Sequence, residues 1–181
     1  MSDAERTSEL EESAQGVDTH QAPVVAQPAI VAGLPSAALA RARTFHNGLR
    51  HAMTGAEAAV AGPSSWQGWL SEVDVSLAEL RQALDDHIGE VEGPDGLLVG
   101  IMFSTPRLAP EVEILRREHR ELVSAVVRAE EISRAVATDP SHDAIRLRRA
   151  VTTLLGRLTL HRQRGSDLVF EAYNVDIGAA D

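Results

Sequence analysis

Four histidines lie within the apolar stripes of four helical patterns, at positions where a packed core ordinarily takes leucine or valine. They are His46, His87, His119 and His161. Burying neutral imidazoles without partners costs on the order of a few kcal/mol each, and burying them charged together costs more. A divalent metal ion would bind all four rings at once. Because the chain has no cysteine, the pattern predicts a buried metal site with nitrogen and oxygen ligands.

Hydrophobic periodicity predicts four long helices that position these histidines. Apolar residues recur at steps of three and four over about 36–60, 65–92, from near Pro110 to Asp139, and from Ser141 to near Gly178. In the connections, Gly62-Pro63-Ser64-Ser65 predicts a turn with an N-cap. After a second break at Gly93-Pro94-Asp95-Gly96, the apolar run LLVGIMF is predicted to form a covering turn or short helix.

Four amphipathic helices with short connections predict an all-α fold, an antiparallel up-down four-helix bundle over residues 35–178. Residues 1–34 carry six acids against the single Arg6 and include two prolines, which favours a disordered acidic tail. In such a bundle the four histidines fall within roughly 12 Å along the axis. That spread predicts one shared site.

Acidic residues near the histidines are candidate further ligands. Glu90 lies three residues after His87 and can share its helix face, whereas Glu92 lies five residues after, near the helix end. Glu118 and Glu121 flank His119 at spacings that point elsewhere. For these two acids we expect solvated positions or hydrogen bonds to the ligands rather than direct ligation.

The C-terminal helix offers weaker candidates. Four residues after His161, where a second carboxylate would face inward, the chain has Gly165. Asp167 and Glu171 lie further along and are ligands or hydrogen-bonding neighbours only if the helix brings them back to the site. His51, which lies off the stripe, and Tyr173, near the helix end, are further candidates for the site or its surroundings.

Four segments in this order resemble the hemerythrin-like family, also called the HHE cation-binding domain. They are FHNGLR with His46, His87 with Glu90 and the EGPDG break, LRREHREL with His119, and LHRQRGSDLVFEAYNVDIG with His161. The resemblance covers about residues 36–178. It implies an up-down bundle that holds non-haem iron, usually as an oxygen- or hydroxide-bridged pair with bridging carboxylates.

Two positions depart from the family pattern, which places a Glu four residues after the second and the fourth histidine. This chain has Val91 and Gly165 there. Three alternatives follow: a mononuclear site, a di-metal site completed by water or by another acid, and a degenerate site that binds little metal. The acids that could complete a di-metal site are Glu92, Asp167 and Glu171.

The resemblance predicts a non-haem iron protein that binds O₂ or a related small ligand, for carriage, sensing or iron handling. Iron is expected before manganese or zinc. One alternative is an iron oxidoreductase that consumes peroxide or NO, so whether the chain is an enzyme stays open. The other is a metal-free helical interaction module in which the histidines are remnants or a pH-responsive core.

Charge and hydropathy limit the partners. The net charge of -10 argues against nucleic acid, whose binding depends on clustered positive charge. The arginines at 116–120 and 146–149 are predicted to be solvated helix faces. No apolar run approaches the roughly 20 residues that span a bilayer, and the acidic N-terminus does not resemble a signal peptide. We therefore expect a cytoplasmic protein without membrane contact.

Overall fold

The computed structural model describes residues 36–65, 68–138 and 144–174, and the acidic tail predicted for residues 1–34 lies outside these ranges. Within the described ranges all regular structure is helical. The described residues belong to one compact unit. Its elements are α1 (Ser36–Ala61), α2 (Trp69–Glu92), α3 (Leu97–Ser104), the 3₁₀ turn η1 (Pro106–Leu108), α4 (Ala109–Thr138) and α5 (Ala144–Asn174).

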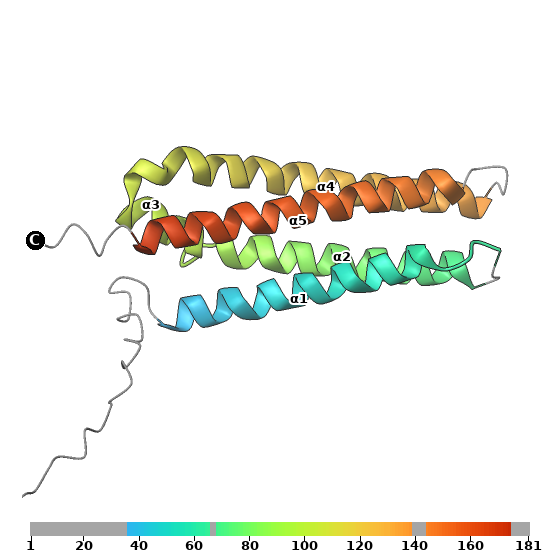
Figure 1. Cartoon of the computed structure of the whole chain (residues 1–181), viewed down its shortest axis with the longest axis horizontal. Helices are drawn as coiled ribbons and strands as arrows, with labels where there is room; N and C mark the ends of the chain where they lie inside the picture. Colours follow the sequence, from blue (N-terminus) through green and yellow to red (C-terminus); the bar gives the residue numbers. More distant parts are fainter. Residues whose placement is uncertain (1–35, 66–67, 139–143, 175–181) are drawn as a thin grey trace, which may run out of the picture. The chain divides into compact units, whose positions relative to one another are not determined.

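The four long helices lie lengthwise beside one another, and successive ones run in opposite directions (Figure 1). Helix α1 contacts α2 and α5, and α4 contacts the same two helices, which closes the ring. Short α3 contacts α1, α2, α4 and α5 at one end. The predicted helical bundle is thus confirmed, and the predicted short helix after the Gly93–Gly96 break is α3.

The apolar stripes form two clusters of buried side chains, and the histidines lie between them. The larger cluster contains Leu84, Leu122 and Leu158, and the smaller one, which includes residues of α3, contains Val91, Leu115 and Leu168. Along each of α2, α4 and α5, the histidine therefore has a residue of the larger cluster on one side and a residue of the smaller cluster on the other. Three imidazoles thus lie together between the two apolar clusters.

The start of α2 differs from the prediction. The helix begins at Trp69 rather than near residue 65, and Gly68 at its N-cap provides no side-chain hydrogen bond. Trp69 is buried, and its Nε1 donates to the carbonyl of Ala59 at 3.0 Å, which ties the end of α1 to the start of α2. Ser64 and Ser65 lie in the turn between the two helices.

The end of α2 follows the prediction closely. The helix stops at Glu92, and the Gly93 amide donates to the carbonyl of Gly89. A Cβ at Gly96 would collide with the carbonyl of Val91, so only glycine fits there. This tight return directs the chain into α3.

No helix in the described part of the chain is long and apolar enough to cross a membrane.

We predict that Leu80→Ala lowers the free energy of unfolding by about 2–5 kcal/mol, because the Leu80 side chain is fully buried in the larger cluster and its loss leaves a cavity. Urea denaturation monitored by circular dichroism measures the change. The control on the same helix is Val75→Ala, at a side chain that is 57% exposed, which should shift stability by roughly 0.5 kcal/mol or less. Equal effects of the two substitutions would contradict the packing described.

Candidate metal centre

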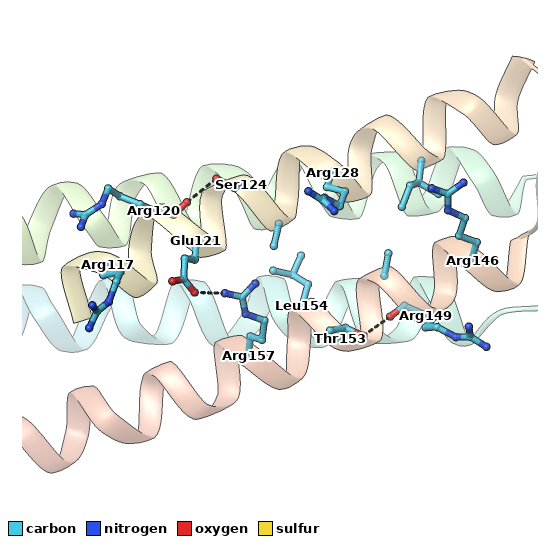
Figure 2. A pocket seen from close by; sticks show the side chains of 13 residues that line it. Arg117, Arg120, Glu121, Ser124, Arg128, Arg146, Arg149, Thr153, Leu154 and Arg157 are labelled. Atoms are coloured by element: carbon cyan, nitrogen blue, oxygen red, sulfur yellow. Dashed lines mark hydrogen bonds and ion pairs between the residues drawn. The ribbon is translucent and has the colours of Figure 1, made fainter. Parts of the chain in front are cut away.

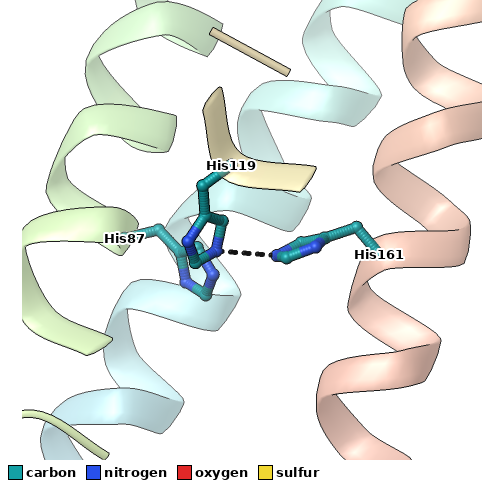
Figure 3. A group of neighbouring side chains, drawn as sticks. All are labelled: His87, His119 and His161. Carbon is teal, nitrogen blue, oxygen red and sulfur yellow. Dashed lines mark hydrogen bonds between the residues drawn. The ribbon is translucent and has the colours of Figure 1, made fainter. Parts of the chain in front are cut away.

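Three of the four predicted histidines converge between α2, α4 and α5. One ring nitrogen from each of His87, His119 and His161 lies within 4.8 Å of the others (Figure 3). His119 and His161 are 2% and 3% exposed, and their Nε2 atoms lie 3.0 Å apart. The ring of His87 meets both of them edge-on, at centroid distances of 5.5 and 5.8 Å.

Two carboxylates contact the Nδ1 atoms of two of these rings, on the side away from the Nε2 atoms. An oxygen of Glu92 contacts Nδ1 of His119, and Oε2 of Glu118 lies 2.9 Å from Nδ1 of His161. A carboxylate accepts, so Nδ1 of each ring is assigned the proton and Nε2 keeps its lone pair. The two lone pairs then face each other across 3.0 Å. Only a proton or a cation between them can turn that contact into attraction.

Burial disfavours the proton. Desolvation lowers the pKa of His87 to about 3, with the neighbouring rings of His119 and His161 adding to the effect. Burial likewise lowers the pKa of His119 to about 3 and that of His161 to about 4. The rings are therefore neutral near pH 7, which is the form in which imidazole binds a metal ion.

The geometry of the rings fits a metal ion. Metal–nitrogen distances of about 2.0–2.1 Å place two neighbouring ligand atoms about 2.8–3.4 Å apart, depending on whether the angle is octahedral or tetrahedral, and the two Nε2 atoms lie 3.0 Å apart. The Nδ1 of His87 is buried and has no hydrogen-bond partner among the described residues. Carboxylates behind metal-binding imidazoles fix their orientation and raise their basicity. Three buried histidines close together could thus hold a metal ion.

A cavity of about 380 Å³ adjoins the three histidines. It is far larger than the roughly 30 Å³ that one water molecule occupies in the liquid. Leu97 and Leu98 of α3 line it together with Gly165 of α5, where an added Cβ would meet nothing within 4 Å. The remaining lining residues are His46, Val91, Leu115, Arg162, Ser166, Val169 and Phe170, besides the three histidines.

His46, the fourth predicted ligand, lies in the wall of this cavity but outside the group of three. Its Nε2 accepts from Nη2 and Nε of Arg162, at 3.0 and 3.3 Å. Burial first, and then the charge of Arg162, lowers the pKa of His46. For His46 to bind the same metal ion, Arg162 would have to release this nitrogen.

The acids of α2 and α4 do not lie where a metal ligand would have to lie, among the three histidine nitrogens. Glu90 is half-buried and does not join the three-histidine group. Glu92, the alternative on α2, contacts Nδ1 of His119 rather than the three-histidine group. Glu118 hydrogen-bonds a histidine rather than facing the metal position, as predicted, and Arg164 contacts its other oxygen.

The candidate acids of α5 are engaged at the surface. Asp167 accepts from Gln163 at 2.8 Å, and Glu171 pairs with Arg107 at 2.6 Å. His51 is exposed on α1, away from the three-histidine group. Tyr173 packs beside the smaller apolar cluster, and its buried hydroxyl has no hydrogen-bond partner within the described ranges.

Sequence reasoning missed Arg162. It directly follows His161 in the chain, and a helical step of about 100° turns it from the three histidines toward α1. Only the pairing of α1 with α5 reveals that it meets His46 and the cavity.

Comparison of this chain with protein-family models, with curated proteins and with solved structures finds no match.

We predict that the metal-free protein loses stability as the pH falls. Unfolded histidines take up protons near pKa 6.5, whereas the three buried rings resist protonation until about pH 3–4. The stabilisation is complete above about pH 6.5. Each ring should therefore lower the free energy of unfolding by about 1–2 kcal/mol between pH 7 and pH 5, measured by urea denaturation of chelator-treated protein.

The variant His87→Leu should flatten this dependence, because it removes one of the three titrating rings. Leu80→Ala is the control, since it should lower stability by a similar amount at both pH values. A pH dependence in His87→Leu equal to that of the wild type would contradict the assignment.

Proposed function

We propose that this chain is a non-haem iron protein of the hemerythrin-like type, which binds O₂ or a related small ligand beside its three buried histidines. The observation that carries the proposal is the pair of Nε2 atoms facing each other at 3.0 Å while carboxylates occupy both Nδ1 atoms. The order of histidine segments along the chain supports iron as the metal.

The available ligands favour one metal ion over a bridged pair. A bridged pair needs carboxylates between its ions, but Glu92 and Glu118 contact Nδ1 atoms on the far side of the rings. Gly165 supplies no carboxylate, and Glu90 is outside the group. Three imidazoles with an open position also suit zinc, so the metal must be identified by experiment.

The surrounding residues suit a small ligand. When bound, a ferrous ion with an open coordination position would supply the point of attachment for O₂ or a similar molecule. Leu97, Leu98 and Leu115 limit the entry of water, and the gap at Gly165 leaves space next to His161. The Arg162 guanidinium contributes positive charge to the cavity wall and would favour a ligand that carries or gains negative charge.

We predict that protein purified anaerobically contains about one metal ion per chain, mostly iron, because the three rings converge on one position. Elemental analysis gives the content, and an absorption spectrum before and after exposure to air shows whether oxygen reacts at the metal. His119→Ala should lower the metal content at least about tenfold, since it removes one ligand and leaves Glu92 unpaired.

The matched control is His51→Ala, an equal substitution at an exposed histidine of α1, which should keep the wild-type metal content. If the protein contains near-stoichiometric zinc and its spectrum does not change in air, the metal is zinc rather than iron. Absence of bound metal after supplementation with iron and zinc would refute it.

We predict that Gly165→Leu weakens binding of azide to the metal-loaded protein at least about tenfold while the metal content stays unchanged, because the new side chain fills the open wall of the cavity. Azide titration followed by absorption measures access, and elemental analysis measures the metal.

The control is Gly156→Leu on the same helix, where an added Cβ also meets nothing within 4 Å but the cavity is not involved. Both variants should gain up to about 1 kcal/mol of stability, since glycine disfavours a helix interior. Equal azide affinity in the two variants would show that the ligand does not enter through this cavity.

A further inference from the structure

A second cavity, of about 750 Å³, lies on the face formed by α4 and α5 (Figure 2). The sequence predicted solvated helix faces for the arginines at 116–120 and 146–149, but the structure brings four of them together along one groove with two further arginines. Glu121 is the one acid among the lining residues. The arginines are Arg117, Arg120 and Arg128 on α4 and Arg146, Arg149 and Arg157 on α5.

Most of these arginines form no ion pair within the described part of the chain. Nη2 of Arg157 pairs with Glu121 at 2.6 Å, and the other five arginines of the groove form no ion pair with a described residue. The chain as a whole carries a net charge of -10, so this groove is opposite in sign to the molecule. Guanidinium groups stay charged and match carboxylate geometry in a bidentate manner.

The floor of the groove is apolar. It is lined by Ala125, Ile132, Ala150 and Leu154, which are less exposed than five of the six arginines. From Arg117 to Ile132 the groove follows α4 for about 22 Å, which equals the length of a helix of about four turns. A rod with one apolar face and acidic flanks would match both the floor and the edges.

We propose that this groove binds an acidic amphipathic helix of a partner protein. Apolar side chains at helical spacing would cover the floor, and flanking Asp and Glu would pair with the arginines of both edges. Nucleic acid fits less well, because the groove contains no aromatic residue on which bases could stack. The proposal stands independently of the metal site.

A peptide library tests the proposal without knowledge of the partner. Random peptides of about 16 residues, displayed on phage, are selected on the full-length protein, and the affinities of enriched peptides are measured by fluorescence anisotropy. We expect enriched sequences with Asp or Glu flanking apolar residues spaced three and four apart. Their affinity should fall at higher salt, because the charge pairs lie near the surface.

Two double variants with the same change in net charge show where the peptides bind. Arg128→Gln with Arg149→Gln removes two unpaired arginines of the groove and should weaken binding at least about tenfold. Arg107→Gln with Arg134→Gln removes two arginines outside it and should change affinity less than about twofold. Glutamine supports α-helices nearly as well as arginine at positions 128, 134 and 149, and Arg107 of η1 forms only a half-exposed ion pair, so both variants should stay folded.

Three outcomes would overturn the proposal. The first is the absence of any enriched peptide, or enrichment of peptides without acidic residues at helical spacing. The second is equal weakening by the two double variants. The third is displacement of the selected peptides by an oligothymidylate of similar length at lower concentration, which would assign the groove to phosphates.

Discussion

The structure depends on the desolvation of three imidazoles in one layer of a helix bundle. The apolar stripes of α2, α4 and α5 are interrupted by His87, His119 and His161. A leucine at these positions would carry no desolvation penalty. Their neutral forms are favoured by burial, and two of them direct lone pairs at one point. A core with this arrangement is stable only while the rings stay neutral or share a cation. Any metal ion held by these three side chains would therefore be linked to folding.

The carboxylates of Glu92 and Glu118 fix the orientation of two of those rings. Glu92 and Glu118 come from different helices, yet each contacts the Nδ1 atom of a histidine on a neighbouring helix. The bundle thus uses its nearest acids to orient imidazoles rather than to bridge two ions. A metal ion placed among the three rings would therefore have nitrogen ligands, which differs from the carboxylate-bridged pair that the family resemblance implies.

Periodicity was sufficient to predict the helices, because apolar spacing reports directly on which face is buried. The start of α2 could not be predicted, since the Trp69–Ala59 hydrogen bond that fixes it joins two helices. The sequence likewise placed His87, His119 and His161 on inward faces, and it favoured a supporting role for Glu118. It could not show that Arg162 meets His46, or that six arginines from two helices form one groove, because these contacts depend on how the helices pair.

Helix α3 has a consequence for the timing of ligand exchange. It contributes Leu97 and Leu98 to the cavity wall, spans only Leu97–Ser104, and joins α2 through the Gly93–Gly96 turn. Lifting it exposes few buried side chains, whereas separating the long helices exposes the whole core. Local opening of such a segment requires much less free energy than global unfolding. If the proposed ligand binds in this cavity, local opening of α3 would let it exchange without global unfolding of the bundle.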